Sequence, residues 1–387
     1  MQSFEIIKGQ GGVRKAGSQD GVCGMVFYLP TANMSALSDE QKRCVVAAAS
    51  DVDAIYPKDS ANKDVLLIGY HLSEVFRINQ SAKVFVQVIA SSGEADLSEV
   101  TSVQDYAEGA CRQIGVWNGY EDSSADQITD LQAAATAMEQ SANNCSIVYC
   151  AKVAFTTLLQ SLYSGAGKCN VSQVIAQDMT AGSRAVAAQT ALGSAAQVGG
   201  LGTIMGCISK AAVNESIAWV AKFNIGWSEP AISDGKKINS ITQGDLATLD
   251  SKRFIFARKY DGIAGCYWSD SHTMDVETSD FGSIEAERAI DKACRGVRTN
   301  LLPYLGSPVY VSDDGTLRAD SLAVLQNVAS QALEDMEKAG ELSGYKVEID
   351  PEQDILANST IEFVIKNVAV GVMRHIKVKI SYTNSID

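Results

Sequence analysis

The sequence predicts a mixed α/β protein of several domains, with a mixed sheet flanked by helices and an extended arm at each end. Three observations support this class. In the first half, short continuous apolar runs alternate with helical segments, as in sheets that helices cover on both faces. In the second half, two long amphipathic helices accompany strands of period two. Both ends carry short apolar segments next to glycines.

Size and charge narrow the class further. The 387 residues suffice for two or three domains, and 46% hydrophobic with 20% charged residues is typical of globular proteins. The net charge of 32 − 46 = −14 argues against nucleic-acid binding. Residues 1–19 carry +2 and residues 366–387 carry +3, which leaves −14 − 5 = −19 between them. Basic ends on an acidic body suit attraction between copies of one chain.

Cysteine and leader patterns indicate where the chain is made. Nine cysteines and three histidines are scattered without metal-ligand spacing, so we expect no metal site. The chain opens without a charged-then-apolar leader, and no run approaches 18 apolar residues. We therefore expect no secretion signal, no membrane insertion, and synthesis in a reducing cytoplasm.

Composition shifts divide the chain into four parts. Phe4, Ile6 and Ile7 form an apolar patch on a glycine-rich tether, which predicts a flexible N-terminal arm. The four parts are an N-terminal arm over residues 1–21, an α/β domain over 22–250, a second domain over 251–370 and a C-terminal arm strand over 371–387.

In the first domain, apolar runs and cap residues define the elements. We expect strands at residues 22–29, 65–68, 84–89 and 146–150. We expect helices at residues 39–49, with Ser38 as N-cap, and at 71–78, 103–114, 125–142 and 151–162. Many Ala, Gly and Ser residues between 179 and 213 predict close backbone packing rather than chemistry.

Motifs for chemistry are weak throughout, so we expect no cofactor and no catalytic residue. The segment 165–169 lacks the first glycine and the final Ser/Thr of a phosphate-binding loop. The segment 200–205 has methionine where a dinucleotide motif needs its third glycine. Asp51, Asp53 and His71 could form a polar site, but their spacing matches no motif, and solvated loop residues are the favoured interpretation.

The second domain begins with a strand at residues 254–257, which leads through a glycine turn into an aromatic strand ending at Trp268. A helix over 284–298 has an apolar stripe and a face of dense mixed charge. A second helix over 321–339 ends at Gly340. Strands of period two follow at residues 345–350 and 361–366.

The last stretch, residues 374–382, alternates between apolar and polar side chains. Ile376, Val378, Ile380 and Tyr382 alternate with Lys377, Lys379 and Ser381. The period of two predicts a strand with one apolar and one basic face. Such a strand either pairs with a sheet of its own chain or completes a sheet in another chain. The pattern alone favours the first.

The order of short motifs over residues 250–383 resembles the C-terminal part of contractile tail sheath proteins of phages and prophages. The resemblance is weak over residues 22–250. The segments that carry it are residues 254–268, Ser279-Asp280-Phe281, residues 288–293, residues 340–344, Ile349-Asp350 and residues 376–382.

The resemblance implies a structural, non-enzymatic subunit that polymerises as stacked hexameric rings around an inner tail tube. The sheath would contract and drive the tube through a target envelope, with energy stored in the lattice rather than supplied by ATP. The chain would be made in the bacterial cytoplasm and assembled in a virion tail or an injection-system sheath. Its partners would be further copies, the tube protein, a baseplate and a tail terminator. Residues 22–250 would be the outer domain and 251–370 the inner domain.

The resemblance also implies roles for two sets of residues. The arms would pair with sheets of neighbouring subunits through Phe4, Ile6, Ile7, Ile376, Lys377, Val378, Lys379, Ile380 and Tyr382. The helix over 284–298 would face the tube through Glu287, Arg288, Asp291, Lys292 and Arg295. Two other functions stay open: a cytoplasmic α/β enzyme with a small-molecule crevice at its strand ends, and a static shell or tube protein.

Overall fold

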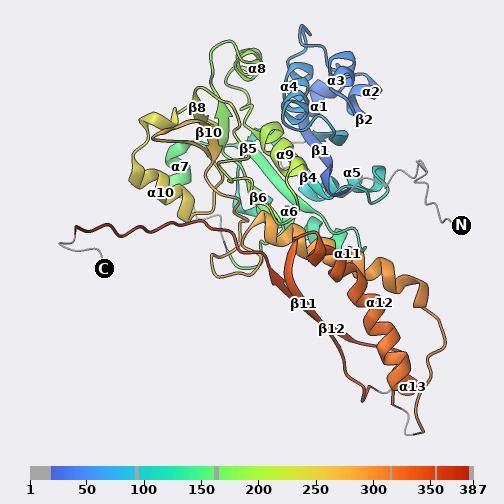
Figure 1. Ribbon diagram of the computed structural model, residues 1–387. Helices are drawn as coiled ribbons and strands as arrows, with labels where there is room; N and C mark the ends of the chain where they lie inside the picture. Colours follow the sequence, from blue (N-terminus) through green and yellow to red (C-terminus); the bar gives the residue numbers. More distant parts are fainter. Residues whose placement is uncertain (1–18, 92–95, 161–164, 314–315, 354, 383–387) are drawn as a thin grey trace, which may run out of the picture.

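The computed structural model describes residues 19–91, 96–160, 165–313, 316–353 and 355–382 (Figure 1). A larger N-terminal part surrounds a six-stranded sheet, and a smaller C-terminal part combines two long helices with a two-stranded sheet. The predicted mixed α/β class is confirmed. Phe4, Ile6 and Ile7 of the expected N-terminal arm lie outside the described residues.

The six-stranded sheet is built around β1 (Val22–Pro30), whose side chains are buried on both faces. Met25 and Phe27 pack into the core on one face, and Val26 and Tyr28 into the core on the other. The strand order is β2-β3-β1-β4-β5-β6; all neighbours are parallel except β2 and β3. The other strands are β2 (Arg43–Val46), β3 (Lys83–Ser91), β4 (Gln113–Asp122), β5 (Ser146–Lys152) and β6 (Val171–Gln173).

Helices cover both faces of this sheet. On one face lie α4 (Lys63–Ile78) and α9 (Leu201–Lys210), and on the other α5 (Thr101–Tyr106) and α6 (Ala125–Gln140). The small residues of α9 allow it to approach α4 closely, as predicted. A Cβ on Gly202 would lie 2.1 Å from the carbonyl oxygen of His71, so only glycine fits there.

Three element predictions in this part are wrong. The run 65–68, expected as a strand, lies inside α4. The helix expected over 103–114 ends at Tyr106, and β4 begins at Gln113. The helix expected over 39–49 is only α2 (Asp39–Lys42), which Ser38 caps as predicted, and β2 follows it. A short apolar run fits a buried helix as well as a buried strand, which explains the first error.

Shorter elements complete the N-terminal part. They are η1 (Gln19–Gly21), α1 (Thr31–Met34), α3 (Ala49–Ile55), η2 (Leu97–Val100), α7 (Phe155–Gln160), β7 (Ala176–Asp178), α8 (Arg184–Leu192), β8 (Pro230–Ile232), η3 (Ile238–Ser240), α10 (Gln243–Ser251), β9 (Ala257–Tyr260) and β10 (Ile263–Trp268). Among the described residues, no helix is long and apolar enough to cross a membrane.

The C-terminal part follows the predicted order of helices and strands. Ala293, Leu333, Met336 and Leu342 form its buried core, which joins both helices to the hairpin. Its elements are α11 (Ile284–Leu301), η4 (Leu302–Tyr304), α12 (Ala319–Lys338), β11 (Leu342–Ile349), α13 (Ile355–Asn358) and β12 (Phe363–Ala369).

Residues beyond position 250, where the sequence predicted a domain boundary, still pack into the hydrophobic cores of the N-terminal part. Phe254, Phe256 and Trp268 belong to the cores on either side of the six-stranded sheet. Even Ile284, the first residue of α11, packs there. The segment after residue 250 therefore belongs to the N-terminal part, and α11 is the element that passes from one part to the other.

We expect Gly202→Ala to lower the unfolding free energy by about 2–3 kcal/mol, because the added methyl group must push α9 away from α4. Urea unfolding of the unassembled protein measures this change. The control is Gly244→Ala in α10, where the new Cβ meets nothing closer than 3.8 Å. Helix propensity should make that variant up to about 1 kcal/mol more stable. Equal losses in both variants would contradict the close packing.

Candidate assembly interface

The C-terminal segment after β12 has no strand partner among the described residues. It runs away from the hairpin as an extended trace (Figure 1). The side chains of Ile376, Val378, Ile380 and Tyr382 are 74%, 71%, 90% and 106% exposed. Large contiguous apolar surface of this kind marks a site for another protein. The alternative in which this strand docks on its own chain is absent from the described fold.

Arg374 fixes the point where this segment leaves the body. Its Nε atom lies 3.0 Å from Oδ1 of Asp270, and its Nη2 atom pairs with the carboxylate of Glu285. The same nitrogen donates to Oγ of Ser271 at 3.3 Å. The side chain of Glu285 is only 6% exposed, so this ion pair is shielded from solvent on one side. The C-terminal arm is therefore anchored to the body at Arg374, and residues 375–382 extend from it without a strand partner in the described chain.

Helix α11 carries Glu285 in its first turn and buries much of its charged face. Glu287, Arg288 and Asp291 are 5%, 3% and 3% exposed. Asn170 donates to the carboxylate of Glu287, and Asn144 donates to Oδ1 of Asp291 at 3.1 Å. These amides belong to the N-terminal part, so the charged face of α11 is an internal joint between the two parts.

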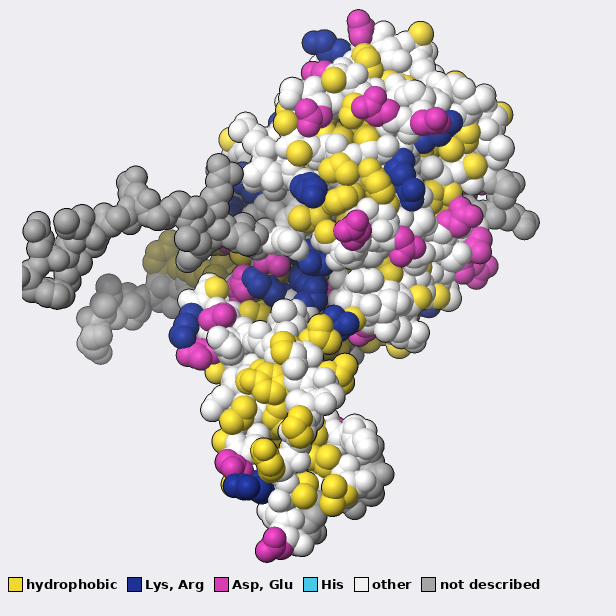
Figure 2. Space-filling view, turned by 90° about the vertical axis from the view of Figure 1, so that its right-hand side faces the viewer, with side chains coloured by type: hydrophobic (Ala, Val, Ile, Leu, Met, Phe, Trp, Pro, Cys, Tyr) yellow, Lys and Arg dark blue, Asp and Glu magenta, His cyan; other side chains and the backbone are white. Residues whose placement is uncertain are grey.

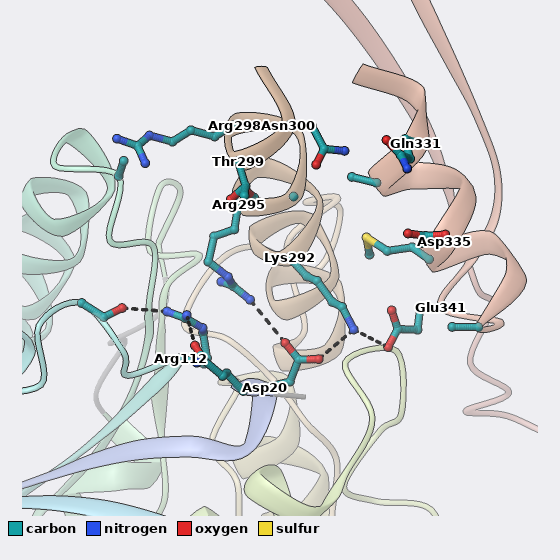
Figure 3. Close-up of a pocket in the computed structure, with 17 residues that line it drawn as sticks. Asp20, Arg112, Lys292, Arg295, Arg298, Thr299, Asn300, Gln331, Asp335 and Glu341 are labelled. Carbon is teal, nitrogen blue, oxygen red and sulfur yellow. Dashed lines mark hydrogen bonds and ion pairs between the residues drawn. The ribbon is translucent and has the colours of Figure 1, made fainter. Parts of the chain in front are cut away.

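The same face holds the start of the described chain (Figure 3). Lys292 Nζ lies 2.7 Å from Oδ2 of Asp20 and 2.7 Å from Oε1 of Glu341. Arg288 donates through Nη2 to the backbone oxygen of Asp20 at 3.3 Å, and Arg295 Nη2 lies 3.7 Å from Oδ1 of Asp20. One helix therefore binds both Asp20, near the start of the described chain, and Arg374, near its end.

The burial of this face bears on the expectation that it contacts a tube. Glu287, Arg288 and Asp291 have almost no surface to offer a tube in this conformation. Lys292 and Arg295 keep side-chain exposures of 27% and 18%, and both are engaged with Asp20. The tube contact itself stays a prediction.

Burial sets the protonation of this joint. It raises the pKa of Glu287 to about 8, and the neighbouring charge of Asp291 adds to the effect. Burial likewise raises the pKa of Asp291 to about 6. It lowers the pKa of the Arg288 guanidinium to about 10. At neutral pH Glu287 is thus mainly protonated, which limits the cost of burying an acid beside Asp291.

The hairpin β11–β12 is an open acceptor for a further strand. It contains two antiparallel strands, and each has an outer edge without a strand partner in the described chain. Tyr345, Val347 and Ile365 pack on the side of α12. An added strand with its own apolar face could extend this layer, as in β-strand addition to a sheet edge. The alternation of residues 376–382 has the required period.

A second apolar surface lies at the turn between α11 and α12. Leu305 and Tyr310 are 83% and 67% exposed, and apolar side chains are prominent over the lower part of the molecule in Figure 2. Contiguous exposed apolar side chains indicate contact with another protein. The most exposed members are Leu302, Tyr304, Leu305, Tyr310 and Val324.

The three residues considered for an enzyme site have separate structural roles. His71 lies on α4 and is fully buried against α9, where Gly202 donates its N–H to Nδ1 at 3.1 Å, and burial lowers the pKa of His71 to about 3. Asp51 accepts from the N–H of Ala48 at the start of α3. Asp53 pairs with Arg184 at 3.4 Å. The expectation of solvated loop residues is wrong for all three in its loop part, because Asp51 and Asp53 lie in α3 and His71 lies in α4. Solvent reaches Asp51 and Asp53 but not His71.

Comparison with solved structures identifies the fold. A chain of the anti-feeding prophage (AFP) baseplate is 14% identical and matches with a TM-score of 0.65, covering 99% of each chain. A chain of the AFP helical sheath in its contracted state is also 14% identical, with a TM-score of 0.63 and 98% of each chain covered. This chain therefore has the fold of a contractile sheath protein, and the resemblance found in its sequence is confirmed.

Sequence comparison then places the chain in a family. The DUF2586 N-terminal domain matches residues 3–272, and the DUF2586 C-terminal domain matches residues 280–387. The chain belongs to the DUF2586 family. A protein of Haemophilus phage HP1 (strain HP1c1), provisionally named as a tail sheath protein, is 31% identical over 117 residues. That match spans 30% of this chain and 29% of the phage protein.

We expect the unfolding free energy to fall as the pH rises from about 5 to 8. The folded state keeps a proton on Asp291 up to about pH 6 and on Glu287 up to about pH 8, whereas the unfolded chain has released both, since free carboxyl groups titrate near pH 4. Each group lowers stability by up to about 1.4 kcal/mol per pH unit until its folded pKa is passed. Urea unfolding at several pH values measures the slope.

The Glu287→Gln variant can still accept a hydrogen bond but has no carboxyl group to titrate. The dependence of the unfolding free energy on pH should therefore flatten between pH 6 and 8. The matched control is Glu337→Gln, an exposed position of α12, which should keep the wild-type slope. An unchanged slope in Glu287→Gln would mean that this carboxyl group is not buried in solution.

Proposed function

We propose that this chain is the structural subunit of a contractile tail sheath. Copies assemble as stacked six-membered rings around an inner tail tube, and the sheath shortens to drive the tube through a target envelope. One observation carries the proposal. The exposed, alternating residues 375–382 follow the anchored Arg374, and the same molecule has a hairpin, β11–β12, whose outer edges have no strand partner in the described chain. The likeness in fold to an AFP sheath chain supports it.

In this proposal residues 375–382 of one copy add a strand to the β11–β12 hairpin of a neighbour. Ile376, Val378 and Ile380 would gain partners for side chains that are exposed in a single copy. Each buried side chain of this size contributes about 1.5–3 kcal/mol, and each backbone hydrogen bond about 0.5–1.5 kcal/mol net. Phe4, Ile6 and Ile7 would form the second lent strand. Pairing through arms leaves the bodies free to move between an extended and a contracted lattice.

The remaining partners follow from the place of such a subunit in a tail. They are the inner tube, a baseplate and a tail terminator, and the likeness to a chain of the AFP baseplate structure supports the second of these. Synthesis takes place in the bacterial cytoplasm, and the assembled sheath belongs to a virion tail or an injection system. The role is structural rather than enzymatic, with energy stored in the extended lattice.

We expect the full chain to form hollow cylinders in negative-stain electron microscopy, and a chain ending at Arg374 to stay as single copies. Val378→Pro should also abolish the cylinders, because proline removes one backbone donor from the lent strand. Ser381→Ala changes the polar face of the same segment and should assemble normally. Equal assembly of the truncated and full chains would contradict strand exchange.

Contraction is tested on the same cylinders. We expect two populations, one longer and narrower and one shorter and wider, with heat or denaturant converting the first into the second. A single geometry under all conditions would identify a static tube instead.

A further inference from the structure

A cavity of about 590 Å³ lies between the N-terminal part and the two long helices. Gly109 and Ala142 border it from the N-terminal part, and α11 and α12 form the opposite wall. Its cations are Arg112, Lys292, Arg295 and Arg298. Figure 3 shows Arg112, Arg295 and Arg298 on one side of the cavity, and Asp335 and Glu341 on the other.

The three guanidinium groups have fewer anionic partners than charges. Lys292 already takes one oxygen of Asp20 and one of Glu341 at 2.7 Å. Arg295 reaches Asp20 only at 3.7 Å, and its Nη1 atom is buried without a hydrogen-bond acceptor among the described residues. A buried cationic donor without a partner costs free energy, so this position favours an additional acceptor.

The other two arginines are similarly available. Arg112 donates to uncharged oxygens, at 2.8 Å to the carbonyl of Gly109 and at 3.2 Å to the side chain of Gln19. Burial, followed by the like charge of Arg295, lowers the pKa of Arg112. Arg298 is exposed and has no ion-pair partner within the described part of the chain. Four cations and three carboxylates, those of Asp20, Asp335 and Glu341, line the cavity. The excess of positive charge favours an additional anion.

We propose that this guanidinium-lined pocket receives an acidic side chain of a second copy of the chain. Guanidinium groups bind carboxylates through paired N–H donors, which suits Arg112, Arg295 and Arg298 together. A second copy is the fitting donor, because the chain between residues 19 and 366 carries a net charge of −19. Figure 2 shows Lys and Arg side chains gathered at the waist between the upper and lower parts.

The position of the pocket supports the same partner. Gln19 and Asp20, the first residues that the structure describes, line it. The identity of the donor rests on the proposed function, in which residues near the start of the chain pair with a neighbouring copy and bring its surface near. The pocket would then lock the relative position of two bodies through a contact that salt weakens.

Sedimentation velocity of the full chain at low and high salt tests the proposal. Arg298→Glu should raise the concentration needed for half-assembly by roughly tenfold or more, and the salt dependence should shrink with it. Arg298 is exposed, so the variant should keep the wild-type unfolding midpoint. The control is Arg318→Glu, which reverses an exposed charge at the start of α12 that is paired with Asp320.

The possible outcomes distinguish failure of the pocket proposal from failure of the sheath proposal. If Arg298→Glu and the wild type assemble equally, the pocket proposal is overturned and the sheath proposal stands. If the wild type itself stays as single copies at all salt concentrations, both fail. Calorimetric titration of single copies with inorganic phosphate is the second experiment. Phosphate binding that Arg298→Glu abolishes, with unaltered assembly, would identify a small-anion site and overturn the role of the second copy.

Discussion

The fold depends most on the buried charged face of α11. Burying a charged or polar group is costly unless it is paired, and Glu287, Asp291 and Lys292 on this face have partners from different regions of the chain. Glu287 and Asp291 meet amides of the N-terminal part, and Lys292 bridges Asp20 and Glu341. Because these partners are spread along the chain, the pairs form together only when both parts are in place.

This joint also holds two residues that lie near the start and the end of the described chain. Glu285 in the first turn of α11 holds Arg374, and Lys292 two turns later holds Asp20. Asp20 and Arg374 are therefore fixed to the body, whereas residues 375–382 project freely. A polymer linked through such arms would transmit force from the lent strand directly into α11. In a sheath, this coupling would let each body turn while its links to neighbours stay intact.

Local pattern predicted the elements whose periodicity was clear, including α6, α12, β1, β3 and the β11–β12 hairpin. It failed where a pattern admits two structures. The apolar run 65–68 is short and mostly buried, so its sequence does not distinguish a helix from a strand. The strand β4 was missed because it contains Gly115, Asn118 and Gly119, which disfavour strands, and burial between β1 and β5 decides its conformation.

The charged face of α11 shows a different limit. Dense charge on a helix normally indicates solvent, and the sequence around residues 284–298 contains none of its partners. Asp20 is far from Lys292 in the chain, as is Asn144 from Asp291, so only the tertiary fold could reveal the pairing. The alternation of residues 376–382 was predictable because it is local, but the pattern alone favoured pairing within the chain, so it did not predict that the segment is free. Its anchor at Arg374 was not predictable either, since Asp270 and Glu285 belong to other elements.

The most direct measurement is a high-resolution cryo-electron microscopy structure of the assembled polymer. We predict that residues 375–382 of one copy pair with the β11–β12 hairpin of a neighbour, while Arg374 keeps its contacts with Asp270 and Glu285 of its own copy. A structure in which this segment pairs within its own chain, or in which Arg374 leaves both carboxylates, would contradict an anchored arm and a lent strand.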